Sequence, residues 1–431
     1  MKFYSLHNNS PRVSFREAVI RGIAPDRGLY FPEKIQPLPD AFFRSIGEIS
    51  HEAIAYEAIL QFAGEDIPPA ELGHILAEVL DFPFPVVEIE NTIATLELFH
   101  GPTMAFKDVG ARFMARCLGY FSRDRTGEVT VLVATSGDTG GAVANGFLGV
   151  PGVKVVILYP GGKVSDIQER QLTTLGQNIS ALEVEGTFDD CQRMVKTAFL
   201  DPDITNHLTL TSANSINVAR WLPQLFYFLF AYKQVKNKTK APVFSVPSGN
   251  FGNLCAGMVA QRLGMPVGHF IAATNVNDTV PRYMDSRKYE PRPSLATISN
   301  AMDVGDPSNF DRIRHLFNDD FEELSAYLSS YSFSDEETRA AIRGIYERTG
   351  YIADPHGAVG YLGLKKYFQE HPETYGIFLE TAHPIKFQEV VEAVTHEKLE
   401  IPPQILKVMG GTKSSTKISN YDELRSFLIP G

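Results

Sequence analysis

The sequence predicts a doubly wound α/β fold that follows a mainly helical N-terminal domain. From about Leu96 onward, short β-branched runs alternate with helix-length amphipathic runs. Continuous apolar strands joined by helices are typical of parallel βαβ units. Residues 1 to roughly 90 are mostly helical in pattern, as in "ISHEAIAYEAILQFAG", and contain clusters of proline. Because 431 residues exceed what one hydrophobic core usually serves, we expect two or three domains.

The alternating pattern consists of buried strands and of the helical runs between them. The predicted strands are "VTVLVA" (129–134), "VKVVILYP" (153–160), "ISALEVEG" (179–186), "PVFSVP" (242–247) and "GHFIAAT" (268–274). The expected domains are an N-terminal accessory domain at 1–90, a large domain at 91–125 and 236–431, and a small domain at 126–235. Ligands of such folds bind beyond the carboxyl ends of the strands, beside helix N-termini.

The most membrane-like run is "WLPQLFYFLFAY", from Trp221 to Tyr232. It contains Pro223 and Gln224 and falls short of the roughly 20 apolar residues of a spanning helix. We therefore expect a buried core helix. The N-terminus has no apolar stretch of the signal-peptide kind.

Charge and cysteine content exclude several classes of function. The formal net charge of −11 argues against binding to nucleic acid or to an anionic membrane surface. Cys117, Cys191 and Cys255 are odd in number and form no CxxC motif. A disulfide framework or zinc site is therefore not expected, and a reducing, cytoplasmic location fits. There is no HExxH motif and no GxSxG motif, and we expect no metal site.

Three glycine- or hydroxyl-rich turns lie where a strand passes into a helix. In "VPSGNFGN" (246–253), Gly249 and Gly252 can expose consecutive backbone N–H groups, which together make a nest for phosphate. In "ATSGDTGG" (134–141), the hydroxyls of Thr135, Ser136 and Thr139 could form an anion site beside Asp138, and the alternative is an ordinary helix N-cap by Asp138 or Thr139. In "SANSINVAR" (212–220), Arg220 could hold a phosphate or carboxylate, and the alternative is a capped helix with an exposed arginine.

Two histidines and a long loop are further candidates for the site. His383 lies in "LETAHPIKF" (379–387), where a strand ends near Thr381. A histidine at a strand end, such as His383, or in a turn before a helix, such as His356, more often has a structural role than a catalytic one. The turn-rich stretch "ATISNAMDVGDPSNFDR" (296–312) suggests a loop over a site.

One lysine stands at a turn of the same kind. In "HGPTMAFKD" (100–108), Lys107 follows an aromatic residue and precedes an acid. Taken alone, each of these turns is weak evidence. Together they supply what a pyridoxal-phosphate enzyme requires: a Schiff-base lysine, a phosphate cradle, a partner for the ring nitrogen and a site for the substrate anion.

These motifs, with "AATNVNDTVPR" (272–282), "SFREAV" (14–19) and "RGLYFP" (27–32), resemble threonine synthase in its longer form with an N-terminal extension. The resemblance implies the fold type II (tryptophan synthase β-like) arrangement of two doubly wound domains. It implies that Lys107 forms the internal aldimine, and it places Thr381 near the pyridine nitrogen. It also implies a cofactor-phosphate cradle made of Gly249, Asn250, Phe251, Gly252 and Asn253.

The same resemblance implies the remaining contacts. Asp138 would contact the phenolic oxygen of the cofactor, where shorter threonine synthases often have Asn. Met104 and Ala105 replace the Gly-Ser that is common in the wider group. Thr135, Ser136 and Thr139 would hold the carboxylate or phosphate of the substrate, and Asn214, Ser215 and Arg220 would grip its phosphate.

The implied reaction converts O-phospho-L-homoserine and water to L-threonine and phosphate. A dehydratase or phospho-lyase that releases 2-oxobutanoate would use the same lysine and cradle. A non-catalytic phosphate-binding module would need Lys107 and Thr381 to be accidental. We expect a monomer or homodimer that acts on a small molecule.

Overall fold

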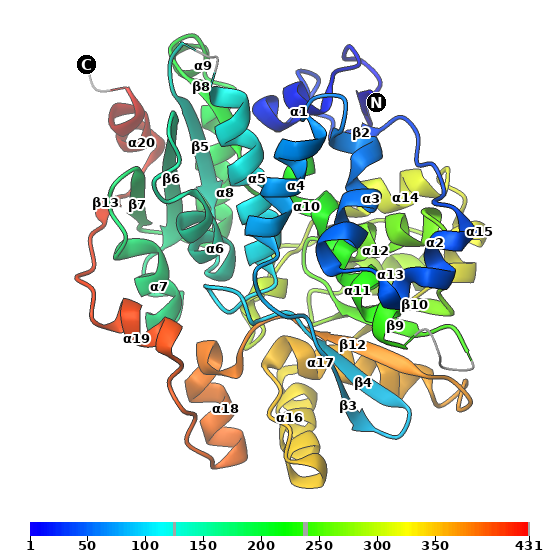
Figure 1. Ribbon diagram of the computed structural model, residues 1–431. Coiled ribbons are helices and arrows are strands. Elements are labelled where there is room, and N and C mark those ends of the chain that lie inside the picture. The colour runs from blue at the N-terminus through cyan, green and yellow to red at the C-terminus, as the bar shows by residue number, and fades with distance from the viewer. Residues whose placement is uncertain (124–125, 236–239, 430–431) are drawn as a thin grey trace.

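The computed structural model describes residues 1–123, 126–235 and 240–429 of the chain. It has two α/β units beside each other and an N-terminal region that covers the larger one (Figure 1). In that view the smaller sheet lies on the left and the larger sheet on the lower right. The predicted α/β architecture with parallel sheets is confirmed.

The larger sheet has the strand order β11-β10-β9-β12-β4-β3 and is parallel except for the edge strand β3. Its strands are β3 (Val86–Glu90), β4 (Ile93–Glu97), β9 (Val243–Pro247), β10 (His269–Thr274), β11 (Leu328–Ser332) and β12 (Gly376–Glu380). The sheet begins at Val86, slightly before the expected start of the large domain at residue 91. The central strands β9, β10 and β12 are buried along their whole length, as expected where helices cover both faces.

The smaller sheet has the order β13-β7-β6-β5-β8 and is entirely parallel. Its strands are β5 (Val129–Ala134), β6 (Val153–Pro160), β7 (Ile179–Val184), β8 (Thr209–Ser212) and β13 (Thr416–Ile418).

The strand β13 corrects the expected domain division. The sequence predicts that residues 236–431 belong to the large domain, but β13 pairs with β7, and α20 (Tyr421–Leu428) packs against α8 (Phe188–Ala198). Leu424 and Leu428 of α20 join the core of the smaller unit, so the chain returns there after leaving the larger one. The remaining division stays a prediction, and its boundaries at 125 and at 236 fall at residues outside the described ones.

The N-terminal region is mostly helical, with one small sheet. β1 (Phe3–Ser5) and β2 (Tyr30–Pro32) pair antiparallel. The helices are α1 (Phe15–Arg21), α2 (Asp40–Ser45), η1 (Ile46–Glu48), α3 (His51–Ala63) and α4 (Pro69–Val79). Ser14 and Glu17 form a capping box that fixes the start of α1. The region shares one continuous core with the larger unit, against which α3 and α4 pack.

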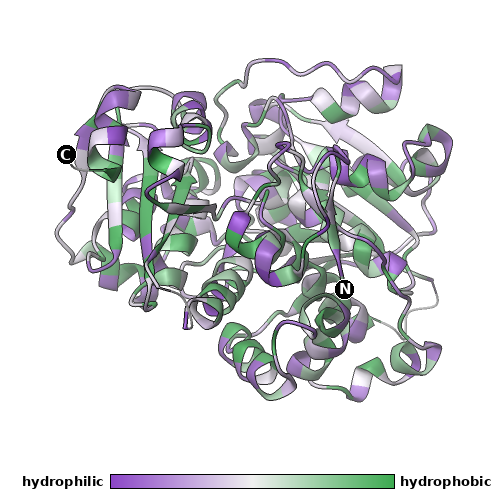
Figure 2. Cartoon of the chain, turned by 90° about the horizontal axis from the view of Figure 1, so that it is seen from above, coloured by the Kyte–Doolittle hydropathy of each residue, from purple (hydrophilic) through white to green (hydrophobic). Residues whose placement is uncertain are grey.

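The apolar run from Trp221 to Tyr232 is the buried core segment that we predicted. It forms the end of α10 (Val218–Trp221), η2 (Leu222–Gln224) and most of α11 (Leu225–Val235), and almost all of its side chains are buried. Figure 2 shows hydrophobic residues concentrated on strands and on the inward faces of helices. No helix in the described part of the chain is both long enough and apolar enough to cross a membrane.

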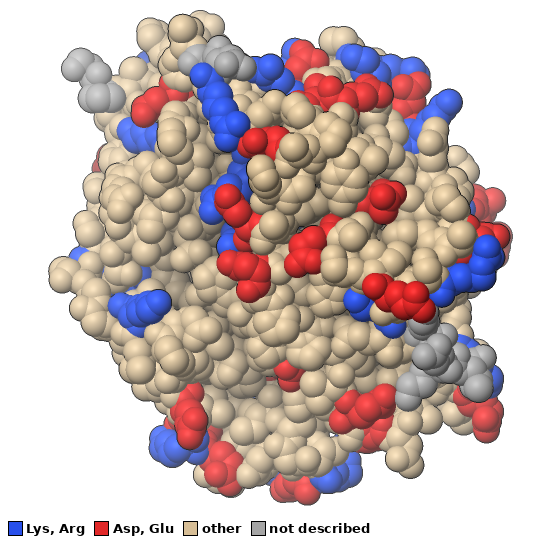
Figure 3. Space-filling view, viewed as in Figure 1, with Lys and Arg blue, Asp and Glu red and all other residues tan. Residues whose placement is uncertain are grey.

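Further helices cover the two sheets. They are α5 (Lys107–Ser122), α6 (Asp138–Phe147), α7 (Asp166–Thr173), α9 (Pro202–Thr205), α12 (Gly252–Arg262), α13 (Thr279–Ser286), η3 (Asn300–Met302), α14 (Phe310–Leu316), α15 (Phe321–Tyr327), α16 (Asp335–Thr349), α17 (Pro355–Tyr367), η4 (Pro384–Phe387), α18 (Gln388–Thr395) and α19 (Pro403–Met409). On the face drawn in Figure 3, acidic and basic side chains are interspersed among the described residues rather than gathered by sign.

Candidate active site

A cavity lies where the carboxyl ends of strands from both sheets meet. Residues at or just after the ends of β5, β9 and β12 line it, which is where a doubly wound fold places its ligands. Every site residue that the sequence predicted lines this cavity, except Asp138. The lining also includes Phe106, Ala134, Phe188, Gln192, Gln224, Pro247, Ala301, Met302, Val304 and His356, which the sequence did not single out as site residues.

Lys107 is the first residue of α5, and the turn before it is tied down by hydrogen bonds. The N–H of Phe106 donates to the carbonyl of Thr381 at 2.8 Å, and the buried hydroxyl of Tyr227 donates to the carbonyl of Phe106. The carboxylate of Asp108 accepts from the backbone N–H of Thr103 at 2.9 Å and from the Thr103 hydroxyl. The aromatic residue and the acid that flank the lysine therefore hold its position.

Two turns of the site carry bulky residues in the left-handed backbone region. Met104 has φ 58° and Phe251 has φ 61°. Glycine adopts this region without cost, whereas other side chains rarely do. The geometry at Met104 gives a physical reason for the glycine that is common in the wider group.

The amine of Lys107 opens into the cavity. Among the described residues it has no hydrogen-bond acceptor, and its Nζ lies 5.5 Å from the centre of the Phe106 ring. Burial lowers the pKa of Lys107 to about 8. The carboxylate of Asp138 opposes this shift, and the charges of Lys386 and Arg220 add to it.

The turn after β9 has the close backbone packing that a phosphate nest needs. Phe251 precedes α12, which begins at Gly252, so the first N–H groups of this helix face the cavity. A Cβ atom on Gly249 would lie 2.5 Å from the carbonyl oxygen of Ala301. The Asn253 side chain fixes the turn by donating to the Pro247 carbonyl at 2.9 Å.

The side chains of Thr135 and Asn214 form hydrogen bonds with backbone groups. The Thr135 hydroxyl accepts from the N–H groups of Gly137 and Gly140 at 2.9 and 2.8 Å, which caps α6. The Asn214 amide donates to the Ala134 carbonyl at 2.8 Å. At this turn the helix N-terminus is therefore capped by Thr135 and not by Asp138 or Thr139. Ser136 and Thr139 line the cavity without hydrogen bonds from their side chains in the described structure.

Asp138 lies behind the cavity wall in a buried ion pair that the sequence did not predict. Its carboxylate lies 2.6 Å from Lys386 Nζ and accepts from the Gln168 amide at 3.0 Å. Lys386 also donates to the Thr103 carbonyl at 3.0 Å. Burial alone would raise the pKa of Asp138, but the charges of Lys386 and Lys107 hold it well below its ordinary value. The only sequence signal for Lys386 was its place in "PIKF".

Arg220 is buried rather than exposed, which corrects the alternative reading of this residue. Only 2% of it is exposed; one guanidinium nitrogen donates to the Ala213 carbonyl, and its Nε has no partner. Burial lowers the pKa of Arg220 to about 10, so the group stays charged. A buried cation without a carboxylate favours an anionic ligand, because pairing would offset its desolvation.

The two histidines are engaged structurally. His383 caps η4 by accepting from the Ile385 N–H at 3.1 Å, and burial lowers its pKa to about 4. His356 lines the cavity, with its two ring nitrogens 2.6 Å from Asp354 and 3.2 Å from the Ala301 N–H. The loop predicted over a site does contribute Ala301, Met302 and Val304 to the cavity.

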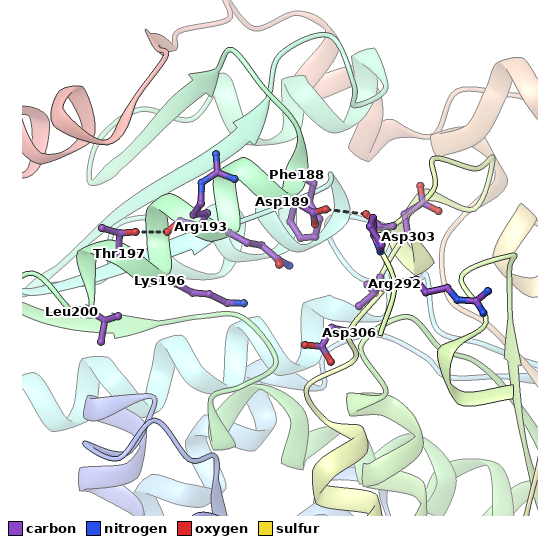
Figure 4. Close-up of a pocket in the computed structure, with 14 residues that line it drawn as sticks. Phe188, Asp189, Arg193, Lys196, Thr197, Leu200, Arg292, Asp303 and Asp306 are labelled. Atoms are coloured by element: carbon purple, nitrogen blue, oxygen red, sulfur yellow. Dashed lines mark hydrogen bonds between the residues drawn. The ribbon is translucent and has the colours of Figure 1, made fainter. Parts of the chain in front are cut away.

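A second pocket adjoins the first and shares Phe188, Gln192 and Val304 with it. It has a volume of about 390 Å³ and lies between α8 and the loop that contains Arg292 and Asp306 (Figure 4). Lys196 extends from α8 toward this loop. The hydroxyl of Ser294 donates to Asp189 at 3.3 Å across the gap. We refer to this pocket as the vestibule.

The cavity fits a phosphorylated cofactor that is held by a lysine. It combines a lysine amine without an acceptor, a helix N-terminus at a tight glycine turn and a buried arginine with an unpartnered Nε. Among the described residues, no cluster of acidic, histidine or cysteine side chains could hold a metal ion. Fold and site together define a pyridoxal-phosphate-dependent enzyme of fold type II.

Comparison with known proteins narrows this class. A family model described as "Pyridoxal-phosphate dependent enzyme" matches residues 85–378. Models described as "Threonine synthase N terminus" and "Threonine synthase, C-terminal" match residues 2–79 and 357–428. Threonine synthase of Escherichia coli is 45% identical over 409 residues, which cover 94% of each chain. Threonine synthase of Saccharomyces cerevisiae is 35% identical over 96% of this chain and 94% of its own.

Solved structures agree with the sequence relatives. The crystal structure of threonine synthase from E. coli has a TM-score of 0.94, with 42% identity over 99% of both chains. A pyridoxal-phosphate-bound threonine synthase from Brucella melitensis has a TM-score of 0.91, with 33% identity over 99% of this chain and 98% of its own. The chain belongs to the threonine synthase family.

Proposed function

We propose that this cavity is where the chain converts O-phospho-L-homoserine and water to L-threonine and phosphate, with Lys107 as the catalytic residue. The observation that carries the assignment of Lys107 is the contrast between a half-buried lysine and a fully buried one. Lys107 presents an amine without an acceptor to the cavity, whereas Lys386 is held by Asp138 and Thr103 and does not line it.

When bound, pyridoxal phosphate withdraws electrons from the amino acid that it holds, which makes the α-proton acidic. The turn of Gly249, Asn250, Phe251, Gly252 and Asn253 would hold the cofactor phosphate through backbone N–H groups. Thr381 would face the ring nitrogen, where a hydroxyl leaves that nitrogen uncharged. The Thr381 side chain lines the cavity without a hydrogen bond to any described residue, which supports this role.

Lys107 Nζ would remove the proton from the substrate Cα and later exchange protons at Cβ and Cγ. A general base works best when its pKa lies near the working pH. The pKa of about 8 leaves a useful fraction of the amine neutral near neutral pH, which an ordinary lysine does not offer.

Arg220 and Ser215 would bind the phosphate that leaves from Cγ of the substrate. The guanidinium of Arg220 would stabilise this phosphate increasingly as its negative charge grows. Ser136 and Thr139 keep their hydroxyls available for the substrate carboxylate, whereas Thr135 and Asn214 would act mainly by shaping the wall. Asp138, which the sequence analysis assigned to the phenolic oxygen of the cofactor, would act from behind the wall together with Lys386.

The competing reaction is elimination that ends in 2-oxobutanoate. The buried Arg220 forms no ion pair with a carboxylate among the described residues, which favours a phosphorylated substrate over free serine or threonine. Product analysis with O-phospho-L-homoserine distinguishes the two reactions. Threonine and phosphate in equal amounts support the proposal, and 2-oxobutanoate as the main product would contradict it.

We further propose that the protein acts in the cytoplasm, as a monomer or homodimer, without nucleic acid. Its three cysteines are buried free thiols, which supports a reducing compartment. Light scattering of the purified protein in solution tests its oligomeric state.

A further inference from the structure

Ser215 is the centre of a hydrogen-bond network at the cavity wall. Its Oγ lies 2.7 Å from the amide nitrogen of Asn250 and 3.0 Å from the amide nitrogen of Asn309. Asn250 lies in the glycine turn after β9, and Asn309 immediately precedes α14. Three separate segments of the chain therefore meet at one hydroxyl.

The orientation of both amides is fixed by neighbours that can act only as donors. The Asn250 oxygen accepts from the backbone N–H of Ser308 at 2.7 Å. The Asn309 oxygen accepts from the guanidinium of Arg312. Neither a backbone N–H nor a guanidinium can accept a hydrogen bond. Each amide must therefore turn its NH₂ group toward Ser215.

Arg312 is itself held in one place. It is fully buried, and it donates to the carbonyls of Tyr30, Ser215 and Ile216 at 3.0, 3.1 and 2.6 Å. Its guanidinium carbon lies 4.9 Å from the centre of the Trp221 ring. No carboxylate pairs with it in the described structure, so its charge polarises Asn309 and, through Asn309, Ser215.

A serine hydroxyl has one proton and two lone pairs. At Ser215 both lone pairs accept, from Asn250 and Asn309, so only the O–H proton is left. No described residue accepts it, and Ser215 lines the cavity. Resting on the function proposed above, we infer that Asn309 and Arg312 are positioning residues that make the Ser215 hydroxyl an obligate donor to a phosphate dianion in the cavity.

Two phosphates could receive this donor, that of the cofactor and that of the substrate. Ser215 lies next to the nest, since a Cβ atom on Gly252 would lie 3.3 Å from the Ser215 Cβ. It also lies in the turn between β8 and α10, the short helix that contains Arg220. The chemistry is the same in both cases, because each is a dianion with strong acceptor oxygens and no free donor.

The sharpest test reverses the direction of one hydrogen bond without changing its length. Asn309→Asp replaces the NH₂ donor by a carboxylate oxygen that accepts the Ser215 proton and still pairs with Arg312. Ser215→Ala removes the hydroxyl, and Asn309→Ala removes the donor but lets the hydroxyl turn. Calorimetry measures inorganic phosphate binding to the loaded protein. Absorbance measures pyridoxal phosphate binding to the cofactor-free protein.

Ser215→Ala and Asn309→Asp should each weaken one of these two affinities by about 10- to 150-fold, and Asn309→Ala should weaken it less. The loss of affinity that Asn309→Asp causes should be at least about tenfold smaller in the Ser215→Ala background than in the wild-type protein. The reason is that the hydroxyl proton captured by the new carboxylate is absent when Ser215 is replaced by alanine. The affinity that falls identifies which phosphate Ser215 serves.

An equal effect of Asn309→Asp in both backgrounds would overturn the inference. If Asn309→Asp does not fold, Ser215→Ala decides alone, and unchanged affinity for both probes would also overturn it. These are binding measurements, so they stand apart from the proposed reaction, which fails separately if the wild-type protein makes no threonine.

Discussion

The ammonium of Lys386 lies 2.6 Å from the carboxylate of Asp138, and both side chains are buried. The pair joins η4 of the larger unit to the start of α6 in the smaller one. It also keeps a negative charge near Lys107 while supplying a positive one that opposes protonation of the same amine. Burial is the main cause of the lowered pKa of Lys107, and the balance of charge in this pair adjusts that pKa further.

We predict that Lys386→Met raises the pKa of Lys107. The pKa of Lys107 is about 8, and the substitution removes a lowering charge while leaving the raising charge of Asp138. The pKa is therefore expected to rise. Pyridoxal phosphate reacts with the neutral amine, so its uptake by the cofactor-free protein falls as pH drops through this pKa. The midpoint of that uptake profile should move to higher pH.

The other groups that face Lys107 serve as controls for this prediction. Asp138→Asn should move the midpoint to lower pH, and the double variant with Lys386→Met should return it near the wild-type value. Lys386→Met alone should also lower the free energy of unfolding by roughly 3–5 kcal/mol, because it leaves a buried charge unpaired. A loss of stability with no change of midpoint would show a purely structural pair. Among the described residues, Arg220 is the other charge that acts on Lys107, and His356 lines the same cavity.

Gly249 should tolerate substitution less well than Gly252. A Cβ atom on Gly249 would meet the Ala301 carbonyl at 2.5 Å, whereas on Gly252 its nearest contact is 3.3 Å. Gly249→Ala should therefore displace the turn and weaken pyridoxal phosphate binding by at least about tenfold, and Gly252→Ala by less. Equilibrium dialysis measures both. If a folded Gly249→Ala variant bound pyridoxal phosphate as tightly as the wild-type protein does, this turn would not be part of the cofactor site.

Arg220→Ala should lower kcat/KM for the phosphorylated substrate by about 10- to 150-fold, since a charge-assisted hydrogen bond is lost. Binding of unphosphorylated L-threonine, followed by the absorbance of the cofactor, should change much less. Arg220→Lys keeps the charge but loses the planar guanidinium, and it should recover part of the activity. Equal losses with both ligands would assign Arg220 to the fold or to the α-carboxylate.

The vestibule should guide the substrate by charge. Lys196 is exposed, has no acidic partner among the described residues and lines the vestibule. Lys196→Ala should lower kcat/KM a few-fold at low ionic strength, and the difference should vanish at high salt because the charges are then screened. The exposed Lys34 of the N-terminal region provides the matched control Lys34→Ala. A salt-independent loss would mean that Lys196 acts by contact rather than by its field.

The sequence predicted the parts of the fold that local pattern controls. β5 and β6 have the bounds that their apolar runs indicated, because a strand buried on both faces is continuously hydrophobic. β13 escaped prediction, because three residues with two exposed side chains carry no such pattern. Its place is decided by pairing with β7, which lies far away along the chain.

The residues of the site likewise fall into those that local motifs predict and those that they do not. Lys107, Arg220 and the glycine turn stand in motifs whose residue types already suggest an anion and an amine. Lys386 and Arg312 do not, because their importance comes largely from contacts across the fold, such as those with Asp138 and with the Ser215 carbonyl. The resemblance places Thr135 at the substrate, although its hydroxyl accepts from N–H groups at the start of the following helix α6, and only the folded turn reveals that competition.

The most direct test of the account is to find which lysine holds the cofactor. Borohydride reduction of the loaded protein should fix pyridoxal phosphate onto the peptide that contains Lys107, and mass spectrometry of the digest locates it. Lys107→Ala should abolish the label and lower turnover by at least about 10²–10⁴-fold, the usual worth of a proton-transfer group. A label on the peptide that contains Lys386, or full turnover by Lys107→Ala, would contradict the account.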